Sequence, residues 1–364
     1  MGESVAGTEI TPHRKTANEN CSMNIRWIYV LVMALVVTPR DLTPAGDRKV
    51  LGEIDFFGYK NLDLAVVRSA LPFREGDMFP PPKVKSSVDL KRQVTESVKQ
   101  ALGSEPTSVS FVCCDSKQRW MAYIGLPGES YQALAFNPTP AEDVRLPRAA
   151  IALRQQFDKA WENAVMTGHA TEDDAEGYTL TNDPTTRSAE LAIREYALHN
   201  ETLILQVLTS SSHARHRAIA SQMTGYGRQS EGQIDALVRA SLDADDSVRN
   251  DAMRALEVLA GAKPDLAQRI PPGPFVRLIR SGAWSDHNKA VLVLAALTKS
   301  RDSKLLATLR ADALDPLLEM ARWRSIGHAE AALSILGRIA GLDEDALDKL
   351  IEDGQSDTII GKFH

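Results

Sequence analysis

The chain has 364 residues, of which 43% are hydrophobic and 25% are charged, and its formal net charge is −6. This length can bury a sizeable core, and the composition is that of a folded protein rather than a disordered one. The negative charge argues against a nucleic-acid-binding protein, because phosphate recognition requires an excess of lysine and arginine. The cysteines and histidines include no spacing that is typical of a zinc site.

The first part of the chain has the layout of an export signal that begins late. Residues 1–22 are polar and without periodicity, so we expect a disordered segment or an over-extended gene start. In residues 23–45, one arginine precedes the apolar run Trp27 to Val37, which is shorter than a membrane span of about 20 residues. We predict an exported protein, periplasmic or secreted, that loses the residues before about Gly46. The alternatives are an uncleaved anchor at Trp27 to Val37, which would be the only membrane contact, and a buried segment of a cytosolic protein.

Residues 48–136 have the pattern of a small α+β domain. Alternation of apolar residues predicts strands, and helical spacing predicts helices, in the order β-α-α-β-β: 50–57, 62–71, 84–102, 108–114 and 120–126. This order, with Gly58 closing the first strand and Gly76 in the turn after the first helix, resembles a POTRA domain. The resemblance implies an exported module that contacts polypeptides by strand addition at a sheet edge. The alternative is an unrelated α+β module that caps the remainder of the chain.

Two adjacent cysteines, Cys113 and Cys114, lie in the predicted strand 108–114. Neighbouring strand residues point to opposite faces, so we expect one buried cysteine and one neighbour that is not bonded to it. The alternative is a vicinal disulfide that acts as a redox switch.

Residues 137–200 predict a mostly helical linker. A core-facing helix is expected at 149–161, an acidic loop at 168–178, further loop through Pro184, and a cap-like helix at 188–199. Oxygen ligands around a glycine in the acidic loop could hold a calcium ion, but their spacing does not match the helix-loop-helix calcium motif. A solvated loop is therefore the favoured interpretation.

Residues 201–354 contain a helix-pair pattern written four times. Aligned small residues recur at intervals of 34, 38 and 42 residues, and the last three are each followed by leucine four residues later: Ala218, Ala252, Ala290 and Ala332. The pattern resembles a HEAT repeat. A helix pair of this size cannot bury its apolar face alone, so neighbouring pairs must stack. The fold class we predict is mainly α, an α-solenoid of HEAT-like helix pairs preceded by the small α+β domain.

The pattern departs from the HEAT family at the turn between the two helices. The family's turn arginine is present as Arg249, and Arg215 is the candidate in the first copy, but the third and fourth copies have His287 and Ala329 there. We therefore expect the family's ladder of aspartates and arginines to be interrupted. Residues 301–312 have helical spacing and predict an extra helix between the last two copies.

Catalytic motifs are absent: the chain has no GxSxG, HExxH, SxxK or phosphate-binding GxxxxGK[ST] sequence. His213 and His216 share a helical face, but zinc requires three or four ligands, so a hydrated turn is the favoured interpretation. We predict no catalytic, cofactor-binding or metal-binding residues and no cofactor.

Charge within the repeats points to a protein partner. Residues 203–354 hold 19 lysines and arginines against 20 aspartates and glutamates, which leaves no basic excess for nucleic acid. We predict a non-enzymatic protein-interaction scaffold of the cell envelope. The alternatives are a HEAT-like lyase of the bilin lyase type and a metal-dependent hydrolase that uses His169 with the acidic loop.

The predicted interaction residues stand where each second helix begins, at the start of the ridge that a solenoid exposes. They are Arg249, Asn250, His287 and Asn288. The alternative gives them local roles, with Arg249 bonded to Asp245 or Asp246 and Asn288 capping its helix.

Overall fold

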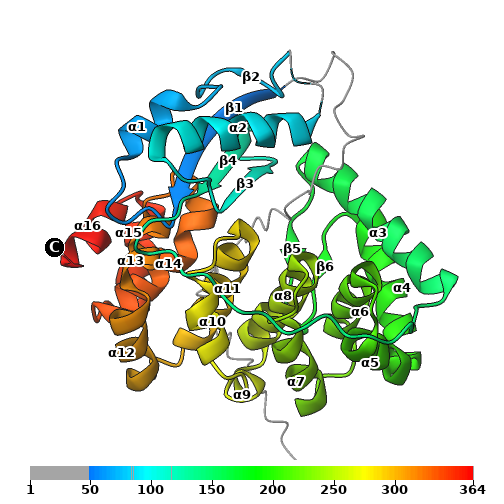
Figure 1. Cartoon of the computed structure of the whole chain (residues 1–364). Helices are drawn as coiled ribbons and strands as arrows, with labels where there is room; N and C mark the ends of the chain where they lie inside the picture. The colour runs from blue at the N-terminus through cyan, green and yellow to red at the C-terminus, as the bar shows by residue number, and fades with distance from the viewer. Residues whose placement is uncertain (1–48, 83, 85, 116, 364) are drawn as a thin grey trace, which may run out of the picture.

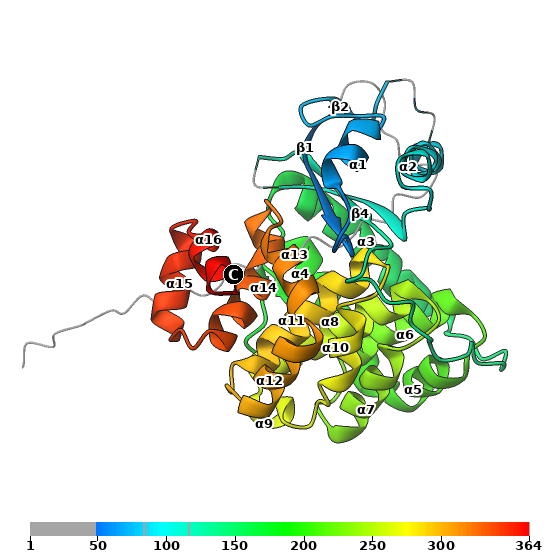
Figure 2. The ribbon, with the colours of Figure 1, turned by 60° about the vertical axis from the view of Figure 1, so that its left-hand side comes forward.

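A computed structural model describes residues 49–363, apart from 83, 85 and 116. The predicted start and export segments, residues 1–22 and 23–45, lie outside the described residues. The described chain is mainly helical, and a small strand-containing domain covers one side of a stack of helices (Figures 1 and 2). None of the helices in this part of the chain combines the length and the apolar character needed to cross a membrane.

The α+β domain follows the predicted order with one added strand. Its elements are β1 (Lys49–Phe57), α1 (Leu64–Ala70), β2 (Met78–Phe79), α2 (Ser87–Leu102), β3 (Ser108–Val112) and β4 (Trp120–Gly125). The sheet order is β2-β1-β4-β3, with β1 parallel to β4 and with β3 and β4 forming an antiparallel hairpin. The added strand β2 pairs with the start of β1. Its two residues are too few to give an alternation signal.

The sheet is buried on both faces, and alternation along β4 assigns each side chain to one of two cores. Ala122 and Ile124 pack against α1 and α2. Met121 and Tyr123 point the other way and join the core of the helical repeats, as does Phe57 of β1. The sheet is thus a layer between its own helices and the repeat stack, and this layering fixes the domain in place.

The expectation for the cysteines is wrong. Cys113 and Cys114 are both buried and are joined by a disulfide. Strand β3 ends at Val112, so the alternation that would separate their side chains does not extend to them.

The linker contains two long helices and a short hairpin. They are α3 (Arg148–Thr167), β5 (Glu172–Asp173), β6 (Leu180–Thr181) and α4 (Pro184–His199). Helix α4 begins four residues before the predicted start, because Pro184 occupies its first turn and the Asp183 side chain accepts the Thr186 N–H at 2.8 Å. The predicted acidic loop forms β5 and the turn after it. Helices α3 and α4 pack against each other and against α6.

The repeats are helix pairs whose second helices stack on one another in the order α6, α8, α11 and α14. The pairs are α5 (Glu201–Ser210) with α6 (Ala214–Gly225), α7 (Glu231–Ala240) with α8 (Asp246–Ala262), α10 (Gly273–Leu278) with α11 (Trp284–Thr298), and α13 (Leu314–Ala321) with α14 (Ile326–Ile339). Two helices lie between pairs: the short α9 (Pro264–Ala267) and the predicted extra helix, α12 (Ser303–Asp312). Three elements follow the last pair: α15 (Glu344–Glu352), α16 (Ser356–Ile360) and the 3₁₀ turn Gly361–Phe363.

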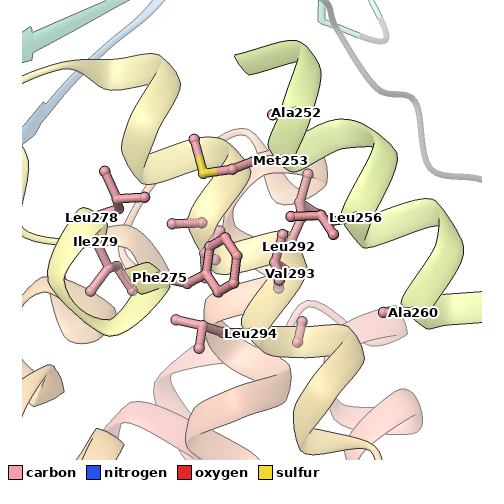
Figure 3. Close-up of a cluster of buried hydrophobic side chains, with 14 of the residues drawn as sticks. Ala252, Met253, Leu256, Ala260, Phe275, Leu278, Ile279, Leu292, Val293 and Leu294 are labelled. Atoms are coloured by element: carbon pink, nitrogen blue, oxygen red, sulfur yellow. The ribbon is translucent and has the colours of Figure 1, made fainter. Parts of the chain in front are cut away.

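The aligned alanines are all buried, as the predicted register requires. Leu256 of α8 is fully buried and lies beside Leu292 and Val293 of α11, with Phe275 of α10 in the same cluster (Figure 3). Small residues let neighbouring second helices approach, and the leucines fill the seam between them.

Two arginines link successive helix pairs. The guanidinium of Arg217 in α6 bonds both carboxylate oxygens of Asp243 at 2.8 Å, and Arg249 in α8 bonds Asp286 of α11 in the same way. The residue that makes this link in the first copy is therefore Arg217, two positions after the predicted Arg215. One helical turn holds both positions, so the sequence pattern alone did not separate them.

Residues 127–147, which we name the strap, run along the turns of three helix pairs (Figure 1). The N–H groups of Gln132, Asn137 and Glu142 donate to carbonyl oxygens that follow or end α10, α7 and α5, at 2.8, 2.8 and 3.1 Å. The strap thereby satisfies carbonyls that a helix end leaves without partners. Pro138, Pro140 and Pro147 favour the extended backbone that this path requires.

Candidate functional site

The four predicted interaction residues lie at the start of α8 and α11, and three of them are buried. Arg249, His287 and Asn288 are 4%, 0% and 4% exposed, and Asn250 is half-buried. The expectation that side chains here are exposed to a partner is wrong for these three. The local alternative named the wrong carboxylate, because the ion pair of Arg249 is with Asp286 and not with Asp245 or Asp246. The local bonds of Arg249 are to the carbonyl oxygens of Asp243 and Ala244.

Other parts of the same chain cover the start of α8 and of α11. The Phe136 ring of the strap lies under the Arg249 guanidinium, with the ring centroid 3.9 Å from Cζ. The Phe57 ring of β1 lies 4.5 Å from the His287 ring, centroid to centroid. A sequence-based reading of one repeat cannot detect this covering, because the strap and β1 are more than a hundred residues away along the chain.

The two histidines of the first repeat also hold the strap. Nε2 of His213 lies 2.6 Å from Asp143, and Nδ1 of His216 accepts the Leu146 N–H at 2.9 Å. The predicted hydrated turn is in fact an attachment point for residues 143–146. Within the described residues, no group of three or more His, Cys, Asp or Glu side chains is placed to hold a metal ion.

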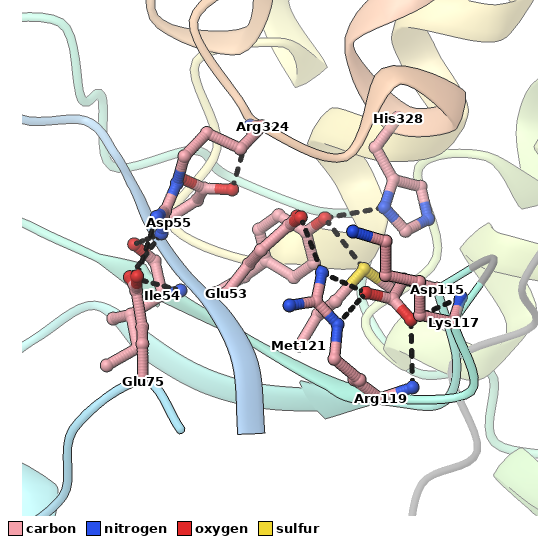
Figure 4. Close-up of polar contacts among 11 residues, drawn as sticks. Glu53, Ile54, Asp55, Glu75, Asp115, Lys117, Arg119, Met121, Arg324 and His328 are labelled. Atoms are coloured by element: carbon pink, nitrogen blue, oxygen red, sulfur yellow. Dashed lines mark hydrogen bonds and ion pairs between the residues drawn. The ribbon is translucent and has the colours of Figure 1, made fainter. Parts of the chain in front are cut away.

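The α+β domain is joined to the repeats by polar contacts, some buried and some exposed. The backbone N–H of Arg324, between α13 and α14, donates to Asp55 at 3.1 Å, and its side chain bonds Glu75 (Figure 4). The Tyr123 hydroxyl and Nδ1 of His328 are hydrogen-bonded at 2.5 Å, and burial lowers the pKa of that histidine to about 3. These contacts fix the domain on the repeats and leave no open space for a ligand at Tyr123, which is fully buried.

A second group of charged residues lies beneath the β5–β6 hairpin, which crosses the second-helix side of the stack beside α8 (Figure 1). Arg254 of α8 pairs with Glu172 of β5 and reaches Thr179 at 3.3 Å. Glu190 of α4 accepts the Thr181 N–H and hydroxyl at 2.6 and 2.8 Å. The hairpin is therefore held to the repeats by charge, which corrects the prediction of a solvated acidic loop.

Two more buried ionisable groups stand beside this pair on the stacked helices. They are Glu257 of α8 and Lys289 of α11, which are 7% and 1% exposed. Burial raises the pKa of Glu172 to about 8 and that of Glu257 to about 7, and it lowers the pKa of Lys289 to about 7. Nearby Arg254 opposes the rise in both glutamates, because it favours the ionised carboxylates.

Several atoms of this group have no hydrogen-bond partner among the described residues. They are Oε2 of Glu172, Oε2 of Glu257, Oδ1 of Asp174 and Nζ of Lys289. Buried polar atoms are ordinarily paired, and leaving one unpaired costs about 1–3 kcal/mol or more for a charged group. Unpaired atoms gathered in one place are a feature of sites that bind a polar ligand.

An open groove of about 360 Å³ adjoins these atoms, between the hairpin and the last turns of α8 and α11. Carboxylates from Glu172, Asp173, Asp174 and Glu257 line it, and Lys299 is the one cation in the lining. Val258, Leu292 and the small residues of both helices form an apolar floor. The groove thus combines an acidic wall with a surface that can take an aliphatic chain. This volume is within the usual range of ligand sites, about 300–1,000 Å³.

A second hollow lies on the other side of the hairpin and carries the opposite charge. Its volume is about 620 Å³, and Arg194, His199, Arg228 and Lys263 line it together with Glu176. The Tyr178 ring at its edge is covered by Arg194, with 3.8 Å from Cζ to the ring centroid. Half of its lining residues are exposed, and none carries an unpaired buried atom among the described residues, so it is the weaker candidate.

Sequence reasoning singled out the acidic loop and missed Glu257 and Lys289. Glu257 follows Leu256, and Lys289 precedes an apolar run from Ala290 to Leu297. A helix that is apolar around its whole circumference is buried on all sides, so a lysine inside it must be buried too. That signal could have identified Lys289, whereas the approach of Glu172 depends on the tertiary fold.

Comparisons with known proteins give only distant structural similarity. No family model matches the sequence, and no curated protein matches it. A designed armadillo repeat protein in complex with the peptide (KR)4 is similar at 18% identity, with a TM-score of 0.36, over 50% of this chain and 87% of that chain. Computationally designed armadillo repeat proteins for modular peptide recognition give 17% identity and a TM-score of 0.35, over 50% of this chain and 86% of that chain.

Proposed function

We propose that this protein is a non-enzymatic scaffold of the cell envelope that binds another polypeptide through its helical repeats. The observation that carries the proposal is the groove beside the β5–β6 hairpin. The strap covers the turns between the paired helices, and the α+β domain covers part of the side formed by the second helices. The groove is open, and three of the residues that line it carry a buried carboxyl oxygen without a partner among the described residues. A site with these properties binds a partner without needing a nucleophile or a metal.

The repeats are proposed to be of the HEAT type. The ion pairs Arg217–Asp243 and Arg249–Asp286 support this assignment, because the resemblance implies a ladder of arginines and aspartates between repeats. The ladder extends over two links and stops at α11, where His287 occupies the position aligned with Arg249.

The α+β domain is proposed to be POTRA-like. Support comes from the order of its elements and from β3, which pairs with β4 alone and so stands at an edge of the sheet. An edge strand can accept an added strand from another chain.

Export remains a proposal that rests on the sequence of residues 23–45. Amino-terminal sequencing of the native protein tests it. The expected result is a chain that begins near Gly46 in a periplasmic or secreted fraction, and a cytosolic chain that begins at Met1 would contradict it.

The two enzymatic alternatives gain no support. His169, on which the hydrolase depends, is exposed and contacts its neighbour Thr167 at 3.2 Å. The decisive experiment is affinity capture from envelope extract with the native protein as bait, with and without excess soluble protein as competitor. Specific capture of a polypeptide is expected, and its absence would overturn the proposed function.

A further inference from the structure

We propose that the groove binds the guanidinium group of an arginine in a partner polypeptide. This inference rests on the proposed function and names the chemistry of the partner. It follows from three properties of the groove: the charge of its lining, the unpaired atoms in its wall and the apolar character of its floor.

Charge selects a cation. Four carboxyl groups and one ammonium group line the groove. Of the two largely buried cations beside it, Arg254 is paired with Glu172, and Lys289 is outside the lining. An anionic ligand would be repelled at this short range, whereas a cation would gain attraction in a partly desolvated site. A phosphate group or an acidic peptide is therefore the wrong partner.

The unpaired atoms select a group with several hydrogen-bond donors. Oε2 of Glu172 and Oε2 of Glu257 belong to side chains that are more than nine-tenths buried, and both residues line the groove. Oδ1 of Asp174 is the third acceptor without a partner among the described residues. Guanidinium has five N–H donors in a fixed plane and is weakly hydrated, so it can serve several carboxylates at once.

Size and shape exclude a bare metal ion. The described residues hold no cluster of ligands at metal-binding spacing, and the groove of about 360 Å³ is much larger than an ion. Val258, Leu292 and Ala296 offer an apolar surface for the three methylene groups of an arginine. Arginine combines this stem with the charged head.

Binding of defined peptides tests the inference. The probe is the acetylated, amidated and fluorescently labelled peptide Ser-Leu-Arg-Leu-Ser, with citrulline or lysine in place of arginine as matched probes. Citrulline keeps the shape of arginine and removes its charge. We expect the citrulline peptide to bind at least about tenfold more weakly, because charge-assisted hydrogen bonds are about twice as strong as neutral ones. Equal affinities for arginine and citrulline would overturn the inference, and equal affinities for arginine and lysine would overturn the choice of arginine.

Variants place the binding site in the groove. Glu257→Gln and Asp173→Asn should each lower the affinity for the arginine peptide by about tenfold. Glu352→Gln, at an exposed position of α15, should leave this affinity unchanged. Among the described residues, the Asp173 side chain accepts one hydrogen bond, from the Ala175 N–H at 3.2 Å, and an asparagine side chain can accept it too. The Asp173→Asn variant therefore tests binding even if Glu257→Gln fails to fold. Lys299→Ala should strengthen binding, because it removes the cation that competes for the same carboxylates.

Failure of this inference is distinguishable from failure of the proposed function. If the Asp173→Asn protein captures the same polypeptide from envelope extract as the parent, and the arginine peptide does not bind, the scaffold function stands and the arginine site is overturned. If neither protein captures a polypeptide, the proposed function itself fails.

Discussion

Arg249 of α8 and Asp286 of α11 form a buried two-pronged ion pair, with Nε and Nη2 of the arginine 2.8 and 3.0 Å from the two carboxylate oxygens. Ser281 donates to the same carboxylate at 2.6 Å, and Phe136 of the strap lies under the guanidinium. Three segments that are distant in sequence therefore meet at one charge pair. The pair belongs to the fold and is inaccessible to a partner.

Removing one member of this pair should strongly destabilise the protein. Arg249→Ala leaves Asp286, which is 0% exposed, as an uncompensated buried charge, and we expect a loss of about 3–5 kcal/mol in the free energy of unfolding. Arg228→Ala is the control, because Arg228 makes only an exposed ion pair with Glu201. Denaturant unfolding measures both, and a loss below about 0.5 kcal/mol for Arg249→Ala would contradict the assigned role.

The register of the repeats predicts the effect of Leu256→Ala. This leucine is fully buried in the seam between α8 and α11 (Figure 3), so truncation should cost about 2–5 kcal/mol. Leu191→Ala in α4 is the matched control, because Leu191 is 46% exposed. If equilibrium unfolding shows equal stability for the two variants, the seam is wrongly placed.

The strap should loosen when its contact with Arg249 is lost. Phe136→Ala removes the aromatic ring under the guanidinium, a contact worth about 0.5–2 kcal/mol. Amide hydrogen exchange of Asn137, whose N–H donates to Leu242, should then become several-fold faster. Ala135→Ser, at an exposed position of the strap, is the control, and unchanged exchange in Phe136→Ala would show that the ring does not hold the strap.

The buried carboxylate of Glu257 predicts a pH dependence of stability. Burial raises its pKa from 4.5 to about 7, so the folded protein binds more protons than the unfolded chain between these values. The parent protein should therefore lose stability relative to Glu257→Gln as pH rises from 4.5 to about 7, by up to about 3 kcal/mol. Chemical unfolding of both proteins across this range measures the difference. A difference that stays constant with pH would contradict a raised pKa.

Much of the fold was predictable because local patterns dominate it. Alternation located β1, β3 and β4, and the buried alanines and leucines located the four second helices within a few residues. The short strands β2, β5 and β6 were missed, because two residues give no periodicity. The early start of α4 was missed because Pro184 was interpreted as a breaker rather than as a first-turn residue.

The candidate site was less predictable because it depends on contacts between distant segments. Residues at the start of α8 and α11 are polar and would be exposed in isolated repeats, but the strap and β1 cover them. Glu172 and Glu257 are 85 positions apart in sequence and meet only where the hairpin crosses the stack. No pattern within a single helix carries this information.

The most direct test of the central claim is a hydrogen-exchange footprint of the protein with and without the captured partner. We expect slower exchange in residues 172–175 and in the last turns of α8 and α11, which line the groove. Exchange along the strap and along β3 should stay unchanged. Slower exchange confined to the strap or to β3, with none at the groove, would contradict the claim that the groove is the binding surface.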